Sequence, residues 1–135
     1  MANTLYPAFK ERALRGETDL LTTPVRLALV DTALYTFDLT HADLTALGSA
    51  VVSAPQLLVN KSVANGVFDA DDVVFPAVLP VGTTVEALVL YLDTGVAATS
   101  TLIAYLDTLT GLPFLANGGA AEVRFDNGSN KIFRL

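Results

Sequence analysis

The chain has 135 residues, a formal net charge of −6, and a composition of 52% hydrophobic against 16% charged residues. This length matches a single domain over residues 1–135, and the absence of cysteine excludes disulfides, thiolate metal sites and a cysteine nucleophile. Because the chain is acidic and has no run rich in Lys and Arg, it lacks a basic patch to neutralise phosphates, and we expect no nucleic-acid binding.

Charged residues are scarce in this chain. A soluble domain usually has about 25% charged residues, so we expect an unusually apolar surface of the kind that is normally buried in an assembly. The longest uncharged stretch, residues 44–60, is broken by glycine, proline and polar side chains, so no membrane span is predicted. Charged residues also lie where a secretory signal needs apolar ones, which predicts a protein that is made in the cytoplasm and is not exported.

The first predicted element is a short helix over residues 4–16. Pro7 suits its first turn, and Gly16 suits the position just after its last turn. Its narrow apolar face consists of Phe9, Ala13 and Leu14. This face suffices for packing on a sheet of the same domain. The alternative interpretation is an N-terminal arm, residues 1–16, that reaches a neighbouring molecule.

A strand and a helical turn follow the helix. Residues 25–30 (VRLALV) predict a strand, and residues 35–38 predict a short continuation or an edge strand. Thr40 and Asp43 resemble a capping box in which Asp replaces Glu or Gln. We therefore expect one helical turn over residues 41–47, stopped by the glycine that follows it.

The next predicted element is a hairpin. Residues 49–54 are small and β-branched, and Pro55 is expected to end this stretch before a strand over residues 56–63. Asn65–Gly66 signals a tight turn. The return strand covers residues 67–75, and an acidic run interrupts it.

Residues 85–108 contain two apolar runs that both end in Asp–Thr, and we expect them to pair as a hairpin of twin strands over 85–92 and 101–106. Both faces of the first run are apolar, so this strand should be buried on both sides. A helix, a second sheet or a neighbouring subunit can cover the second face. Since apolar strand surface exceeds what one small fold hides by itself, we expect a neighbouring protomer to cover the remainder.

The C-terminal region predicts a last hairpin. Residues 121–126 alternate between apolar and polar, Asn127–Gly128 is the strongest turn signal, and residues 131–135 should pair with 121–126. Turn signals separate seven or eight short strands in all. The fold class we predict is mainly β, an antiparallel β-sandwich or barrel with a short N-terminal helix and one additional helical turn.

The densest group of carboxylates consists of Asp69, Asp71 and Asp72. Alternate Asp residues can bind Ca²⁺ through oxygen, as in an EF-hand loop. This sequence lacks the glycine and the final glutamate that such a loop needs. We therefore interpret the group as a solvated acidic turn and predict no metal site.

Three further residues are candidates for hydrolase chemistry. His41 is the only histidine, and no G-x-S-x-G elbow accompanies it. Asp93 and Asp107 end the twin strands and have the residue type of a glycosidase pair, although Asp–Thr at a strand end is more simply a turn former. Gly118–Gly119 does not precede a helix, so no phosphate loop is predicted. We expect no enzyme, with no catalytic, cofactor-binding or metal-binding residues and no cofactor.

Several stretches resemble a family of small virion proteins of tailed bacteriophages and prophages. They include MANTLYPAFKERALRG, VRLALVDTALYTF, NGVFDADDVVFPAV, VEALVLYLDTG, LIAYLDTLTGLPF and the ending NGG-AEVRFDNGSNKIFRL. The resemblance covers nearly the whole chain and is clearest at residues 65–75 and 117–135. The family has no catalytic motif, so the resemblance implies a structural part of the particle.

Within that family, a capsid decoration (cement) protein is the first expectation. It implies a protein on the capsid surface that binds the major capsid protein and associates with itself as a trimer. Residues 1–16, the loop 76–84 and the twin strands are the segments we expect to make these contacts. The alternative is a tail or fibre component with a receptor- or glycan-binding face, and fold alone does not decide between them.

Overall fold

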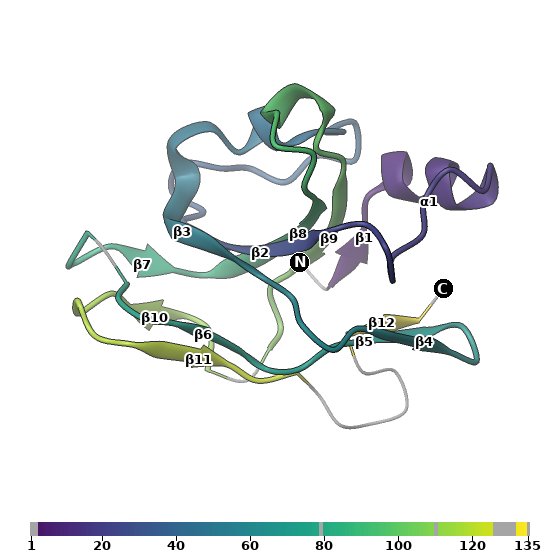
Figure 1. Ribbon diagram of the computed structural model, residues 1–135. Coiled ribbons are helices and arrows are strands. Elements are labelled where there is room, and N and C mark those ends of the chain that lie inside the picture. The colour runs from purple at the N-terminus through teal and green to yellow at the C-terminus, as the bar shows by residue number, and fades with distance from the viewer. Residues whose placement is uncertain (1–2, 79, 110, 126–131, 135) are drawn as a thin grey trace.

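The computed structural model describes residues 3–78, 80–109, 111–125 and 132–134. The fold is mainly β, with antiparallel sheets, one α-helix and short 3-10 turns, as the sequence predicted (Figure 1). Its largest part is a five-stranded sheet in the order β1-β9-β8-β2-β3. The strands of this sheet are β1 (Thr4–Leu5), β2 (Val25–Val30), β3 (Val51–Leu57), β8 (Ala87–Leu92) and β9 (Leu102–Leu106).

The centre of this sheet is the predicted pair of twin strands. β8 and β9 are antiparallel neighbours, and a short 3-10 turn η3 (Ala97–Thr99) lies in their connection. β2 pairs with the other edge of β8 in unbroken register, from Val25 opposite Leu92 to Val30 opposite Ala87. The hairpin prediction and the strand over 25–30 are confirmed.

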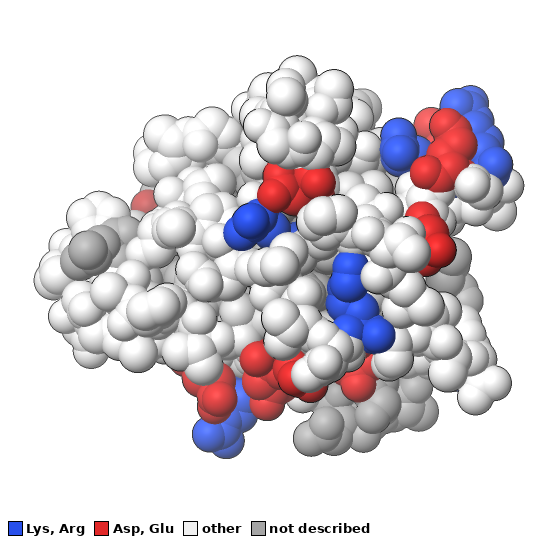
Figure 2. All heavy atoms as spheres, in the orientation of Figure 1, with Lys and Arg blue, Asp and Glu red and all other residues white. Residues whose placement is uncertain are grey.

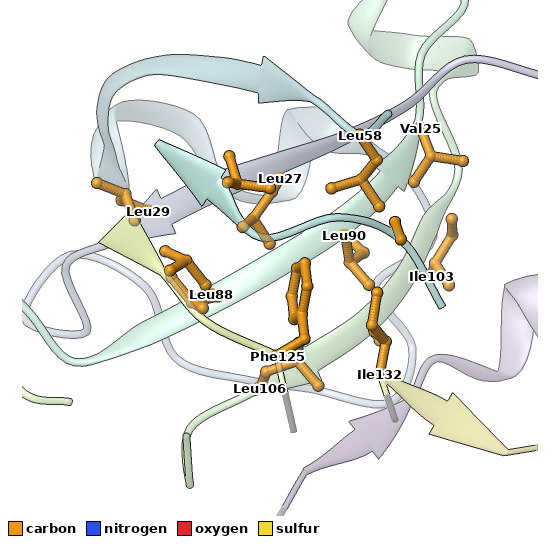
Figure 3. Close-up of a cluster of buried hydrophobic side chains, with 14 of the residues drawn as sticks. Val25, Leu27, Leu29, Leu58, Leu88, Leu90, Ile103, Leu106, Phe125 and Ile132 are labelled. Carbon is orange, nitrogen blue, oxygen red and sulfur yellow. The ribbon is translucent and has the colours of Figure 1, made fainter. Parts of the chain in front are cut away.

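Three small sheets form a second layer, drawn below the large sheet in Figure 1. They are β7 (Thr84–Val85) with β10 (Phe114–Leu115), β6 (Val73–Phe75) with β11 (Ala121–Val123), and β4 (Ser62–Ala64) with β5 (Val67–Asp69) and β12 (Phe133–Arg134). The larger hydrophobic core fills the space between the two layers. Figure 3 shows Leu27, Leu88 and Leu90 of the large sheet facing Phe125 and Ile132 of the second layer.

A second core lies on the opposite face of the large sheet. The connection from β2 to β3, residues 31–50, arches over that face (Figure 1). It buries Tyr35, Leu47 and Ala50 against side chains of β2, β8 and β9. Every residue of β8 and β9 is therefore buried within its own chain. The prediction that a neighbouring protomer must cover these strands was wrong, because this connection supplies the cover.

The details of that connection also differ from the sequence-based expectations. Residues 35–38 are not part of any strand. The predicted helical turn is two 3-10 turns, η1 (Leu44–Ala46) and η2 (Gly48–Ala50). Asp43 rather than Thr40 caps η1, since its Oδ1 accepts a hydrogen bond from the Thr45 backbone N–H at 3.0 Å.

β3 runs through Pro55 instead of ending there. Pro55 has no N–H to donate, and β3 tolerates it because this strand is at the edge of the five-stranded sheet. The pairing with β2 shifts between Leu27 and Leu29, where Ser53 adopts a φ of 61°. β3 pairs with β2 again beyond this bulge, at Gln56 and Leu57, and the chain then continues toward the second layer (Figure 1).

The predicted C-terminal hairpin is not formed by the described residues. β11 pairs with β6, with Ala121 opposite Phe75, and β12 pairs with β5, with Phe133 opposite Phe68. Asn127–Gly128 lies outside the described residues. The predicted return strand 67–75 is likewise divided, because β5 and β6 belong to different sheets. The turn at Asn65–Gly66 is confirmed as the connection of β4 and β5.

The N-terminal helix is confirmed as α1 (Pro7–Leu14), with Pro7 in its first turn and Gly16 at a φ of 70° just after it. Phe9 is buried in the larger core, whereas Leu14 is 87% exposed and does not belong to the apolar face. β1, which sequence reasoning missed, attaches the segment before the helix to β9. Within the described residues, no helix is long and apolar enough to span a membrane.

Candidate functional site

The described residues contain no group of three or more His, Asp or Glu side chains that is suited to holding a metal ion. The acidic run after β5 is used in local hydrogen bonds. Asp71 Oδ2 accepts a hydrogen bond from Asn60 Nδ2 at 2.6 Å, and Asp72 Oδ1 accepts one from the Phe125 backbone N–H at 2.9 Å. Asp71 and Asp72 are exposed, as expected for a solvated acidic turn, and their hydrogen bonds also tie this turn to neighbouring segments.

Asp93 and Asp107 lie at opposite ends of the antiparallel twin strands. Leu106, next to Asp107, pairs with Leu88, which is five residues before Asp93. Asp107 therefore lies opposite Ala87, six residues from Asp93, and at about 3.4 Å per residue the two backbone positions are roughly 20 Å apart. A glycosidase pair needs about 5–9.5 Å, so these two residues do not form one.

Both carboxylate oxygens of Asp93 accept hydrogen bonds from the fold itself. Its Oδ2 accepts a hydrogen bond from Arg26 Nε at 2.6 Å, and its Oδ1 accepts one from the Gly95 backbone N–H at 2.9 Å. The hydrogen bond from the Arg26 guanidinium is the main reason that the pKa of Asp93 is lowered from its usual value. Asp107 donates its backbone N–H to Asn3 Oδ1 at 2.8 Å, which holds the start of the chain against the end of β9.

His41 joins a chain of hydroxyl groups rather than a catalytic triad. Its Nδ1 is 2.8 Å from the Tyr35 hydroxyl, which is 2.8 Å from the Tyr6 hydroxyl. Tyr6 and Tyr35 are buried in the second core, and burial is the main cause of the raised pKa of both phenols. Both phenols are therefore neutral at neutral pH. Because Tyr6 is the N-cap residue of α1, this chain of hydrogen bonds links the start of α1 to the connection 31–50.

Sequence reasoning missed this tyrosine cluster. All four tyrosines of the chain are buried: Tyr6, Tyr35, Tyr91 and Tyr105. All four belong to the second core on the second face of the large sheet, where the rings of Tyr35 and Tyr105 are 6.2 Å apart. The apolar setting of Tyr91 and Tyr105 in the twin strands could have indicated part of this cluster, whereas nothing local marked Tyr6 or Tyr35.

Two of the surface grooves of the described residues lie beside the N-terminal segment. One, of about 570 Å³, lies between α1 and the β12-β5-β4 sheet, and Asp19 is its only titratable lining residue. The other, of about 480 Å³, lies along β1, and Arg134 is its only titratable lining residue. Neither groove holds the pair of acid and base groups that hydrolytic chemistry needs.

The surface is instead notable for its apolar side chains. Figure 2 shows a face that is mostly uncharged, with acidic and basic groups scattered in small clusters. Large apolar side chains that are at least half exposed lie on several elements of the described chain: Leu14, Leu21, Leu34, Leu39, Val59, Val63, Val74, Val81, Val96 and Leu115.

Compared with known proteins, the chain matches no protein-family model and no curated protein.

Proposed function

We propose that this protein is a structural protein of a bacteriophage virion, and specifically a capsid decoration (cement) protein. In this proposal it is made in the host cytoplasm, binds the major capsid protein on the outside of the head and associates with itself as a trimer. Its role is to stabilise the head by adding contacts between capsid subunits. The resemblance of its sequence to small virion proteins first suggested this function.

The observation that carries the proposal is the set of exposed apolar side chains on a surface that is poor in charge. Single exposed apolar residues are ordinary on any protein. Here they accompany 16% charged residues in the whole chain, well below the usual share of about 25%. A protein whose role is to contact other proteins fits such a surface better than an enzyme does.

Two of the three segments expected to contact partners support the proposal. The N-terminal segment 1–16 presents Leu14, and the loop 76–84 presents Val81, and both side chains are largely exposed. The twin strands are excluded as a contact surface, since all residues of β8 and β9 are buried in the chain itself. We therefore place the partner contacts on α1 and the loop 76–84.

The test is to count the copies in purified virions and to mix the purified protein with expanded capsids that lack it. Hundreds of copies on the head, and saturable binding to the capsids, are expected. A few copies located on the tail would contradict a role on the head and would support a tail or fibre component with a receptor- or glycan-binding face. Absence from the particle would contradict both.

A further inference from the structure

Two Asn–Gly pairs lie within the described residues, at 65–66 and 117–118. In such a pair the glycine backbone nitrogen can attack the asparagine side-chain carbon Cγ. A C–N bond forms, the bond to the amide nitrogen breaks, and ammonia leaves. Water then opens the resulting succinimide ring to give aspartate or isoaspartate. Glycine permits this attack most readily because it has no Cβ to obstruct the approach.

At Asn117 the attacking nitrogen is that of Gly118, and hydrogen bonds to the segment around Val78 hold it in place. The Gly118 N–H donates to the Val78 carbonyl at 3.1 Å, and the Val78 N–H donates back to the Gly119 carbonyl at 3.0 Å. The side chain is engaged as well, since Asn117 Oδ1 accepts from the Gly119 N–H at 2.9 Å. Reaction at Asn117 requires these contacts to open first.

The turn at Asn65 is different. Asn65 and Gly66 connect β4 to β5, are both exposed, and adopt φ values of 53° and 76°. These values are typical of a tight two-residue hairpin turn, in which the flanking residues Ala64 and Val67 pair with each other. Among the described residues, neither the Gly66 N–H nor the Asn65 side chain has a hydrogen-bond partner. Water reaches both reacting groups without local unfolding.

We propose that Asn65 is a site of spontaneous deamidation in the folded protein, with water as the only co-reactant. The change replaces a neutral amide by a carboxylate at the tip of the hairpin. Isoaspartate also adds a methylene group to the backbone of a turn that has only two residues. Val63 and Gly66 line the groove beside α1, so the modification alters the charge and the shape of that groove.

The experiment incubates the folded protein at mildly alkaline pH and follows the two asparagines by mass spectrometry. Trypsin leaves both in one peptide, residues 62–124, because no Lys or Arg lies between Lys61 and Arg124. Cleavage with chymotrypsin, or electron-transfer fragmentation, separates them and distinguishes isoaspartate from aspartate. We expect Asn65 to react roughly tenfold faster than Asn117, since a backbone hydrogen bond protects only the second site.

Two controls make the outcome decisive. In denaturant the two sites should react at similar rates, because the protecting contacts at Asn117 are gone. The variant Asn65→Gly keeps a residue that tolerates the turn's positive φ and should remove the fast product. Equal rates in the folded protein, or a faster reaction at Asn117, would overturn the proposal.

Discussion

Asp93 shows how one residue at the end of a strand serves two structural purposes. Its hydrogen bond from the Gly95 N–H forms the turn that the Asp–Thr pair predicted. Its hydrogen bond from Arg26 links the ends of β8 and β2, and no local pattern in the sequence indicated this contact. The two side chains are 23% and 37% exposed, so water weakens the interaction without removing it.

We predict that Asp93→Asn lowers the free energy of unfolding at pH 7 by about 1 kcal/mol, the value expected for a partly exposed ion pair with a charged hydrogen bond. The pKa of Asp93 is lowered in the folded protein. Its contribution is therefore present above the unfolded-state pKa and is lost as the pH falls through the lower folded-state pKa. Urea unfolding at neutral and acidic pH measures both effects.

The control for this prediction is Glu122→Gln. Glu122 makes a similar contact of 2.6 Å with Arg124 Nε, but both side chains are more exposed. This substitution should leave the urea midpoint at neutral pH unchanged. An equal loss of stability in both variants, or an effect of Asp93→Asn that persists unchanged in acid, would contradict the role given to the Arg26 contact.

The four buried tyrosines give a prediction for alkaline pH. Burial raises the pKa of each phenol above its ordinary value of 10.0. The neutral phenols thus stabilise the fold fully below the unfolded-state pKa, and this contribution is lost as the pH rises through the raised folded-state pKa values, because the unfolded chain ionises first. We expect phenolate absorbance to appear only together with unfolding. Absorbance that rises while the near-ultraviolet circular dichroism stays native would contradict this.

Tyr91→Phe isolates one member of the cluster. Tyr91 makes no side-chain hydrogen bond to another described residue, so removing its hydroxyl leaves no partner unsatisfied. The loss of stability with pH above the unfolded-state pKa should become shallower, by at most about 1.4 kcal/mol per pH unit. Denaturant midpoints measured across the alkaline range give this slope, and an unchanged slope would show that Tyr91 ionises in the folded protein.

Among the elements, the connection 31–50 is the one that buries the second face of the large sheet. It converts a strand pair that looked like an interface into the middle of a closed core. We predict that Leu47→Ala, in this connection, costs about 2–5 kcal/mol of unfolding free energy, as is usual for a fully buried leucine.

The matched control is Leu34→Ala in the same connection, where the side chain is 61% exposed. We expect a change within about 0.5 kcal/mol for this variant. Amide exchange in β8 should accelerate in Leu47→Ala and stay slow in Leu34→Ala, because only the first substitution opens the second core. Similar stability of the two variants would mean that the connection does not protect the sheet.

The three central strands of the large sheet, β2, β8 and β9, could be predicted because their signal is local. Residues 87–92 are a continuous apolar run and residues 25–30 are interrupted only by Arg26. Both runs end at turn formers, and such runs indicate strands buried on both sides. β7, β10 and β12 have only two residues each. Strands this short depend on a partner that is distant in the sequence, and two residues are too few to show an alternation of apolar and polar side chains. The same limit applies to Tyr6 and Tyr35, which meet across the fold.

The molecule buries its own strands β8 and β9, so any partner has to bind other parts of the surface. β8 and β9 contribute nothing to the surface, while α1 and the loop 76–84 lie at separated places in Figure 1 and each present an apolar side chain. A protomer with two separate contact surfaces can bind a capsid with one and a neighbouring copy with the other. Closure into a trimer further requires that the surface facing the neighbouring copy meet a different patch of that copy, because a patch that pairs with itself gives a dimer.

We predict that Leu14→Asp and Val81→Asp fold normally but lose assembly. Both side chains are more than half exposed, so a charge there should shift the denaturant midpoint little. In a contact surface, the same change removes buried apolar area and buries a charge, which should weaken binding by about tenfold or more. Sedimentation velocity measures self-association, and co-sedimentation with expanded capsids measures capsid binding.

Val96→Asp is the matched control, since Val96 is 58% exposed on the connection between β8 and β9, outside both segments. It should bind capsids and associate like the unaltered protein. If one of the first two variants loses only self-association and the other only capsid binding, the two surfaces have separate partners. Full binding by both variants, with Val96→Asp alone defective, would move the contact surface to the connection between the twin strands.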